Sequence, residues 1–390
     1  MRVYLVGGSV RDELLGLPVK DRDWVVVGST SQEMERLGYK PVGRDFPVFL
    51  HPQTREEHAL ARTERKVGPG YKGFVVHADP QVTLEQDLER RDLTINAIAR
   101  DPQDGLIDPF GGQKDLRAGV LRHVSPAFAE DPVRILRVAR FAARFGFAVA
   151  PETLALMRAM VADGEADALV AERVWQEFAR GLMEKNPWRM LAILSQSGLL
   201  ARWLPELGLA IEDERAADEA SAIVAQALGY AASHAHSLPV RFALLLHGAR
   251  GRPDDSPSTA LESVCVKLRV PSDCRDLAVL AERKIDAALN ADRFGPEALM
   301  TLLEASDAFR RPQRLDELMN AAEAEGFGAG RPADEAARRA EIVRLALEAA
   351  QSVDAGALAR QHAASDIGPR VRQARIERIT AALERRRTSS

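Results

Sequence analysis

The feature that most constrains the fold is a change of pattern near residue 120. Before it, short apolar runs at Val3–Val6, Trp24–Val27, Pro47–Leu50 and His58–Ala61 predict strands, which glycine turns and brief helical stretches separate. After it, apolar residues recur at helical spacing in segments rich in alanine and arginine. The sequence therefore predicts an α+β chain: a head with a mixed or antiparallel sheet and helices, followed by an all-helical neck and body.

Length and composition exclude several classes of protein. The 390 residues suffice for two or three domains with a large core. No apolar run approaches the roughly 18 residues that span a bilayer, and the N-terminus is too short for a signal peptide. With only Cys265 and Cys274, a disulfide framework and a cysteine-rich zinc site are excluded, and we expect a cytoplasmic setting. The net charge of −4 means that any nucleic-acid site must be a local basic surface.

A glycine turn, Gly7–Asp12, directly follows the first predicted strand and leads into a helix. Paired glycines let backbone N–H groups approach an anion, the helix start adds partial positive charge, and Arg11 adds a full one. The pattern suits a triphosphate, although by itself it is also typical of an ordinary turn.

Two aspartates, Asp21 and Asp23, open the second predicted strand. Side chains two apart on a strand point to the same side, so the two carboxylates repel unless a cation lies between them. Mg²⁺ prefers such oxygen ligands together with water and phosphate oxygens. The spacing therefore indicates a metal site for nucleotidyl transfer, with a solvated acidic turn as the alternative.

Arg90–Ala97 is the third polar cluster, within a stretch from Leu84 to Ala99 whose spacing predicts a helix. Arg91, Asp92 and Asn96 would then point away from the core and offer a cation and two hydrogen-bonding groups to a phosphate or ribose. A salt-bridged surface helix is the alternative.

The helix expected over Glu130–Phe145 carries arginines at spacings of three, three and four. They form one stripe on the helix, while apolar residues anchor the other side. The simpler interpretation of such a stripe is a solvated helix face. The more specific interpretation is a binding surface. Its members are Arg134, Arg137, Arg140 and Arg144.

Taken together, these clusters resemble the DNA polymerase β-like nucleotidyltransferase superfamily, and more narrowly the bacterial class II tRNA nucleotidyltransferases, the CCA-adding enzymes. The resemblance is close to about residue 205 and looser beyond. The matching stretches are Leu5–Asp12, Lys20–Trp24, Arg91–Ala97, Asp108–Phe110 and Glu130–Arg137.

The resemblance implies a catalytic and metal-binding role for Asp21 and Asp23, and it places Glu57 as a candidate third carboxylate. It implies Mg²⁺ as cofactor and CTP, ATP and tRNA as partners. Neither a membrane nor a protein partner is indicated. The residues expected to bind the nucleotide are Gly8, Arg11, Arg91, Asp92, Asn96, Asp131, Arg134, Arg137 and Arg140.

The resemblance further implies that Asp131 and Arg134 act as a surrogate base. Cytosine and adenine each place an amino donor beside a ring-nitrogen acceptor, which a carboxylate and a guanidinium satisfy. Uracil and guanine present the opposite order and leave charged groups unsatisfied, at about 1–3 kcal/mol each. We therefore expect stepwise addition of C, C and A to tRNA with release of pyrophosphate.

The expected domains are a catalytic head (1–120), a helical neck with the nucleotide-selecting helix (121–210), a helical body that resembles a degenerate HD domain (211–320) and a C-terminal tail (321–390). Gly68–Gly73 matches the position of the family's flexible loop. The arginine-rich end, Arg370 to Arg387, is either a solvated helix or a tRNA contact.

An HD phosphohydrolase site needs Asp after His, but here Gly248 follows His247, and His362 is the only later histidine. We therefore expect a metal-free remnant without phosphohydrolase activity. Two other functions stay open at this point: a poly(A) polymerase of the same superfamily, and a catalytically inactive tRNA-binding module.

Overall fold

The structure is a computed structural model that describes residues 1–390 except 20, 43–46, 67–73, 249–256, 362–363 and 390. The chain divides into two compact units. The N-terminal unit comprises residues 1–181 and 189–203, and the C-terminal unit comprises residues 182–188 and 204–390. The finer division at residues 120, 210 and 320 stays a prediction. No helix among the described residues has the length and apolar character needed to cross a membrane.

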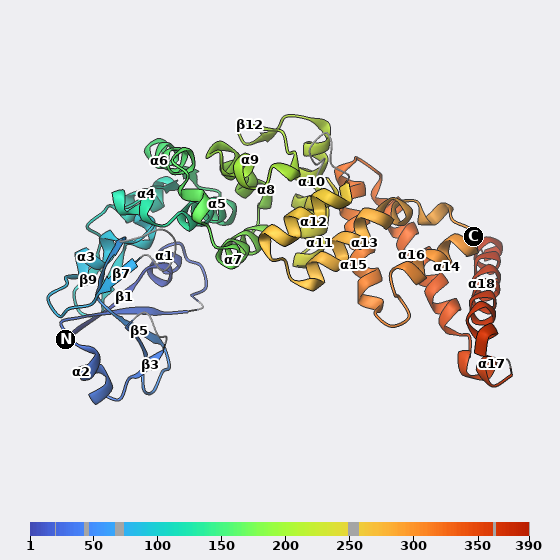
Figure 1. Ribbon diagram of the computed structural model, residues 1–390, viewed down its shortest axis with the longest axis horizontal. Helices are drawn as coiled ribbons and strands as arrows, with labels where there is room; N and C mark the ends of the chain where they lie inside the picture. Colours follow the sequence, from blue (N-terminus) through green and yellow to red (C-terminus); the bar gives the residue numbers. More distant parts are fainter. Residues whose placement is uncertain (20, 43–46, 67–73, 249–256, 362–363, 390) are drawn as a thin grey trace. The chain divides into compact units, whose positions relative to one another are not determined.

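A mixed sheet forms the frame of the N-terminal unit (Figure 1). Neighbouring strands are antiparallel except for one parallel pair, β2 with β5. The four strands expected from the sequence are confirmed as β1, β2, β4 and β5. Within the described residues the sheet has seven strands, in the order β3 (Lys40–Val42), β4 (Val48–Leu50), β5 (Glu57–Leu60), β2 (Asp23–Val27), β1 (Arg2–Val6), β8 (Ala99–Asp101) and β9 (Gly105–Ile107).

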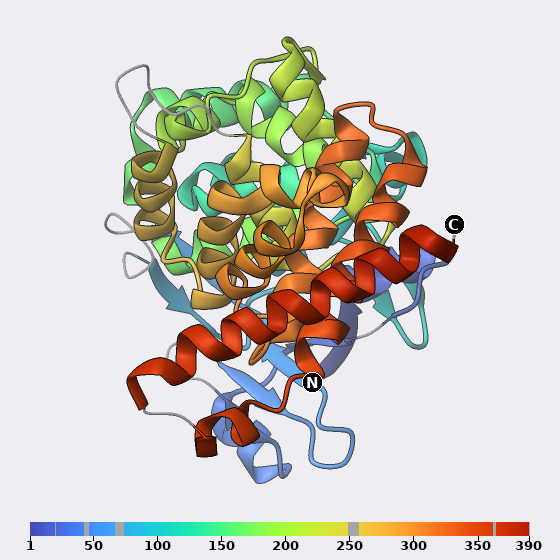
Figure 2. The same cartoon turned by 90° about the vertical axis from the view of Figure 1, so that its right-hand side faces the viewer.

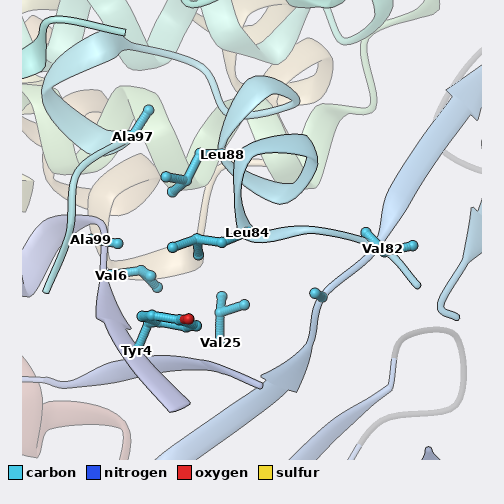
Figure 3. Close-up of a cluster of buried hydrophobic side chains, with 9 residues drawn as sticks. Tyr4, Val6, Val25, Val82, Leu84, Leu88, Ala97 and Ala99 are labelled. Carbon is cyan, nitrogen blue, oxygen red and sulfur yellow. The ribbon is translucent and has the colours of Figure 1, made fainter. Parts of the chain in front are cut away.

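Helices cover both faces of this sheet because side chains alternate along each strand. Val25 faces α3 (Leu84–Glu89), whose Leu84 and Leu88 project toward the strands in Figure 3. Its neighbour Val26 packs with Met34 of α2 (Ser31–Arg36) on the opposite face. Since Asp23 shares the parity of Val25, it lies on the α3 side, where the site is built.

The helix predicted over Leu84–Ala99 is wrong beyond its first turns. α3 ends at Glu89, a 3₁₀ turn follows at Thr94–Asn96, and Ala99 already belongs to β8. The Leu84–Leu88 spacing is helical, but beyond it the backbone pairs with another segment: Leu93 bridges to His123. These tertiary hydrogen bonds override the local periodicity.

The remaining elements of the N-terminal unit are mainly helical. β6 (Thr63–Lys66) pairs antiparallel with β7 (Phe74–His77). The glycine-rich stretch 68–73, expected to match the family's flexible loop, lies outside the described residues. β10 (Val120–Leu121) and β11 (Ala148–Val149) form a parallel pair. Each strand is too short to produce a recognisable alternation of apolar residues in the sequence. The helices are α1 (Gly8–Leu14), α4 (Gly112–Ala118), α5 (Val133–Phe145), α6 (Pro151–Ala162), α7 (Ala171–Leu182), α8 (Pro187–Gln196) and α9 (Leu199–Trp203).

Over its described residues, the C-terminal unit is helical apart from one short antiparallel pair, β12 (Ile211–Glu212) with β13 (Arg215–Ala216). Its last helix, α18, packs against α14 and α16 (Figures 1 and 2). There Arg372 and Arg386 form ion pairs with Glu304 and Glu341, and Arg375 lies 3.8 Å over the Phe309 ring. The helices are α10 (Glu219–Ser233), α11 (Leu238–His247), α12 (Pro257–Leu268), α13 (Ser272–Leu289), α14 (Pro296–Ala305), α15 (Pro312–Gly328), α16 (Ala333–Gln351), α17 (Ala355–Gln361) and α18 (Ala364–Ser389).

Candidate active site

The carboxylates of the site gather where β2 and β5 begin. Asp23 lies directly opposite Glu57 in the parallel ladder, and Asp21 precedes β2. All three residues are exposed and line a cavity of about 670 Å³. Desolvation by the surrounding protein raises the pKa of Asp23, as does the charge of Asp21, while Arg91 lowers it.

This donor set fits Mg²⁺, because it consists of oxygen ligands whose mutual repulsion a cation would relieve. Over the described ranges, no three His, Cys, Asp or Glu side chains converge as a complete metal site. Water and nucleotide phosphate oxygens would therefore have to supply the other ligands, as is usual for Mg²⁺ with a phosphate substrate.

The glycine turn brings α1 close to the arginine cluster. Gly7 has φ = +71°, which strongly favours glycine, and a Cβ there would lie 2.8 Å from an Arg91 nitrogen, so a side chain would also displace that guanidinium. Arg11 is buried, hydrogen-bonds to Asp12 and Asn96, and lies 5.0 Å from the Phe141 ring. It thus ties α1 to the Thr94–Asn96 turn and to α5.

Asp92 is the centre of a buried ionic network. It accepts hydrogen bonds from Arg137 Nε at 2.7 Å, from Asn96 Nδ2 at 2.9 Å and from the Leu93 amide at 2.8 Å. Burial alone would raise the pKa of Asp92, but the Arg137 charge and these donors hold it far below its usual range. Conversely, the charge of Asp92 raises the pKa of Arg137.

A second buried carboxylate, Asp87, orients two arginines. It is fully buried and accepts from Arg90 Nη2 at 2.6 Å and Arg91 Nη2 at 3.2 Å. Burial favours its neutral form, yet these two cations lower the pKa of Asp87. Asp87 therefore fixes the arginines that follow α3, a role that the sequence did not suggest.

A cavity of about 470 Å³ collects most of the predicted residues, and it shares Asp23 and Glu57 with the first cavity. Among the described residues, six arginines and four carboxylates line it, so its wall is net positive beside the edge that carries Asp21, Asp23 and Glu57. This charge balance suits a polyanion such as a nucleoside triphosphate. The charged lining residues are Asp23, Glu57, Asp92, Asp131, Arg62, Arg90, Arg91, Arg134, Arg137 and Arg173.

Asp131 and Arg134 both line this cavity, and each is held at two points. Asp131 precedes α5 and accepts from Arg173 Nη1 at 3.1 Å and Nη2 at 2.8 Å. Arg134 donates to the carbonyl oxygens of Ala127, at 2.8 Å, and Arg90, at 2.7 Å. Each side chain thus lines the cavity while its position is fixed by other partners.

The remaining predicted residues support the cavity from behind its wall. Gly8, Arg11 and Asn96 belong to the α1 network, and buried Arg140 donates from Nε to Glu177 Oε2 at 2.6 Å. The arginine stripe of α5 is thus a set of buried and half-buried ion pairs and cavity residues, not a solvated face.

Sequence analysis missed Arg173 and Glu177 of α7, whose partners are Asp131 and the pair Arg137 and Arg140. Their spacing of four residues was the one available signal, and it is equally typical of a surface salt-bridging helix.

A separate cavity of about 260 Å³ lies in the C-terminal unit, at the position of the expected HD remnant. His247 Nδ1 lies 2.8 Å from Glu325 Oε2, and most of the other lining residues are apolar. Burial alone would lower the pKa of His247, but the hydrogen bond and charge of Glu325 raise it. A Cβ at Gly248 would lie 2.1 Å from Val224 Cγ2, so the packing here excludes an aspartate.

Comparison with known proteins agrees with this geometry. Residues 3–122 match the family model of the poly A polymerase head domain, and residues 146–210 match one described as "Probable RNA and SrmB- binding site of polymerase A". The fold, the paired aspartates and the arginine-lined cavity define the chain as a nucleotidyltransferase with a poly A polymerase head.

Two curated relatives, both named multifunctional CCA protein, share 54% identity with the chain. The one from Azoarcus sp. (strain BH72) aligns over 98% of this chain and 97% of its own length, and the one from Chromobacterium violaceum over 92% of each. The chain therefore belongs to the family of the multifunctional CCA proteins.

Solved structures show the same fold at low identity. A CCA-adding enzyme in complex with ATP matches with a TM-score of 0.68 at 24% identity, covering 97% of this chain and 86% of that one. The Thermotoga maritima CCA-adding enzyme complexed with tRNA matches with a TM-score of 0.66 at 23% identity, covering 97% and 87%.

Proposed function

We propose that the chain adds C, C and A to the 3′ end of tRNA from CTP and ATP, with release of pyrophosphate. The observation that carries this proposal is that Asp131 and Arg134 line the same cavity as Asp23. A base-reading pair and a metal-binding edge around one space are what template-independent, base-selective nucleotidyl transfer requires. The names of the curated relatives support the same reaction.

Base selection follows from the hydrogen-bonding types of the pair. The Asp131 carboxylate accepts from the amino group of cytosine or adenine, and the Arg134 guanidinium donates to the adjacent ring nitrogen. Uracil and guanine would set a ring N–H against Arg134 and a carbonyl against Asp131. Each mismatched charged group loses about 1–3 kcal/mol, which corresponds to about 5- to 150-fold in selectivity.

Asp21 and Asp23 would hold Mg²⁺, with Glu57 across the strand pair as the candidate third carboxylate. When bound, the metal activates the attacking hydroxyl and neutralises the leaving pyrophosphate. The chain itself contributes charge and orientation: Arg91 and Arg137 face the triphosphate, and Asp87 and Asp92 fix their guanidinium groups.

The two alternatives are less well supported. A poly(A) polymerase would use the same Asp131–Arg134 logic for adenine, but the curated relatives at 50–54% identity are named multifunctional CCA proteins. A catalytically inactive tRNA-binding module would have no need of an intact carboxylate edge beside the base-reading pair.

We also propose that the chain lacks HD phosphohydrolase activity. His247 is already paired with Glu325, and Val224 fills the space that an aspartate at position 248 would need. Purified protein should show no metal-dependent hydrolysis of 2′,3′-cyclic nucleotides. Activity that a chelator removes and Mn²⁺, Ni²⁺ or Mg²⁺ restores would contradict this proposal.

The main proposal is tested with a tRNA transcript that lacks its 3′ CCA. With Mg²⁺, CTP alone should extend it by two residues, and CTP with ATP by three and no further. ATP alone should give little product, whereas long A-tails would support the poly(A) polymerase. No extension under any condition would support the inactive module.

A further inference from the structure

A further carboxylate, that of Glu56, lies beside the carboxylate edge, which comprises Asp21, Asp23 and Glu57. Glu56 directly precedes β5 and lines the larger cavity together with those three residues. Its side chain is 27% exposed. The metal-binding role and the nucleotide contacts proposed above do not use Glu56, yet several partners hold its side chain. These contacts therefore need another explanation.

The partners of the Glu56 side chain come from both strands of the edge. Trp24 Nε1 donates to Oε2 at 3.1 Å, and the Thr54 hydroxyl donates to the same oxygen at 3.2 Å. Arg22 Nη1 lies 3.7 Å from Oε1. Arg22 and Trp24 directly precede and follow Asp23, whereas Thr54 belongs to the turn that leads into β5. The Glu56 carboxylate thus ties the start of β2 to that turn.

The turn itself is fixed by two histidines. The carbonyl oxygen of Glu56 accepts from the His51 amide at 2.9 Å and from His58 Nδ1 at 3.2 Å. His51 Nδ1 in turn accepts from the amides of Gln53, at 3.3 Å, and Thr54, at 3.2 Å. Because the backbone of Glu56 is held in this way, its side chain has a fixed base from which to hold β2.

Hydrogen bonds of the sheet do not hold the whole carboxylate edge together. The parallel ladder of β2 and β5 begins at the pair Asp23 and Glu57, so it does not reach Asp21. Arg22, which follows Asp21, contacts Glu56 instead. Carboxylates that share a cation repel each other, and ligands that are already held in place lose less conformational freedom when the cation binds. Contacts that keep Asp21 near the ladder therefore raise the affinity of the edge for a metal ion.

We propose that Glu56 is a positioning residue for the carboxylate edge: by binding Trp24 and Arg22 it keeps the two aspartates at the spacing that Mg²⁺ requires. The inference rests on the proposed function, because it takes the carboxylate edge as the metal site. Glu56 acts from behind this edge. Its partner Trp24 alternates with Asp23 along β2 and stacks on His58, at 5.6 Å between ring centroids, on the opposite face of the sheet.

Two competing roles are direct coordination of the metal by Glu56 and a general contribution of negative charge. Both depend on the charge, so glutamine and alanine at position 56 would weaken metal binding equally. Positioning depends on the hydrogen bonds, and the amide oxygen of a glutamine still accepts from Trp24 and Thr54. The contact that glutamine loses, with the largely exposed Arg22, contributes little. Trp24→Phe removes a donor without changing any charge.

The experiment compares full-length wild type with Glu56→Ala, Glu56→Gln and Trp24→Phe. The first measurement is the Mg²⁺ concentration that gives half-maximal CTP incorporation into tRNA lacking CCA. The second is direct binding of Mn²⁺ followed by electron paramagnetic resonance, without nucleotide or tRNA, with Asp21→Asn as the blank for binding elsewhere. Glu35→Gln is the matched control for charge, since Glu35 is exposed on α2. Thermal unfolding shows whether each variant is folded.

Removing a group that orients metal ligands commonly weakens metal binding by about 10- to 100-fold. Glu56 acts through the neighbours of the aspartates, so we expect a smaller effect. Glu56→Ala and Trp24→Phe should raise the half-maximal Mg²⁺ concentration and the Kd for Mn²⁺ by about fivefold or more. Glu56→Gln and Glu35→Gln should stay within about twofold of wild type. At saturating Mg²⁺, the KM for CTP and the preference for CTP over UTP should not change.

Equal weakening of Mn²⁺ binding by Glu56→Gln and Glu56→Ala would overturn the inference, because charge or coordination would then explain the effect. A folded Glu56→Ala or Trp24→Phe protein that binds Mn²⁺ like wild type would overturn it as well. If Trp24→Phe does not fold, the comparison of alanine with glutamine at position 56 decides. If wild type shows no metal-dependent addition of C, C and A to tRNA, the proposed function fails instead, so the two failures are distinguishable.

Discussion

Replacing Asp92 with asparagine tests the buried network that supports the cavity. The substitution keeps the shape but removes the charge that neutralises Arg137 Nε at 2.7 Å. Breaking a fully buried ion pair costs about 3–5 kcal/mol. The Arg137 side chain is 34% exposed and still has Glu177 at 3.5 Å, so solvent and the second carboxylate reduce the loss to about 2 kcal/mol.

In a unit of this size, about 2 kcal/mol corresponds to a decrease in Tm of about 4–8 °C. Calorimetry measures the shift, and peptide-resolved hydrogen exchange assigns it to the N-terminal unit. Asp104→Asn is the control, because Asp104 forms an exposed ion pair with Arg2 at 3.0 Å and should cost less than about 1 kcal/mol. Equal destabilisation by the two substitutions would refute the assignment of Asp92 as the centre of the network.

Three further predictions concern the metal edge and the C-terminal unit. Asp21→Asn or Asp23→Asn should lower Mg²⁺-dependent CTP incorporation by about 10³-fold or more without changing Tm, and near-normal turnover would contradict the metal role. Because the folded pKa of His247 is raised, its ion pair stabilises the protein at low pH and is lost as pH rises through that pKa. Glu325→Gln should therefore cost about 1 kcal/mol near pH 6 and progressively less at higher pH, and a pH-independent loss would refute this. Gly248→Ala should destabilise by about 1–3 kcal/mol, while Gly229→Ala in open space on α10 should not; similar Tm values would contradict the packing.

The parts of the candidate site that depend on residues adjacent in the sequence could be predicted from the sequence. The strand that begins at Asp23, the Gly7 turn and the residues Asp131 and Arg134 follow from adjacent positions and from the family resemblance. The sheet order is also consistent with the expected mixed sheet. These features depend on alternation and turn chemistry, which short segments already show.

The supporting interactions could not be predicted in the same way. Arg173 binds Asp131, which lies 42 residues away in the sequence. The spacing of four residues between Arg173 and Glu177 is equally typical of an exposed helix with surface salt bridges. In the sequence, Asp87 cannot be distinguished from an exposed helical carboxylate. In the structure it is buried and forms ion pairs with Arg90 and Arg91. Such partners depend on tertiary packing. Tertiary packing also explains why the helix that was predicted over Leu84–Ala99 ends at Glu89.

The most direct test of the account is four-nucleotide selectivity in Asp131→Ala. Wild type should incorporate CTP and ATP far better than UTP and GTP. The variant should lose about 5- to 150-fold of that preference while still binding Mg²⁺ at the unaltered carboxylate edge. A folded Asp131→Ala protein that selects C and A as sharply as wild type would contradict the claim that Asp131 and Arg134 read the base.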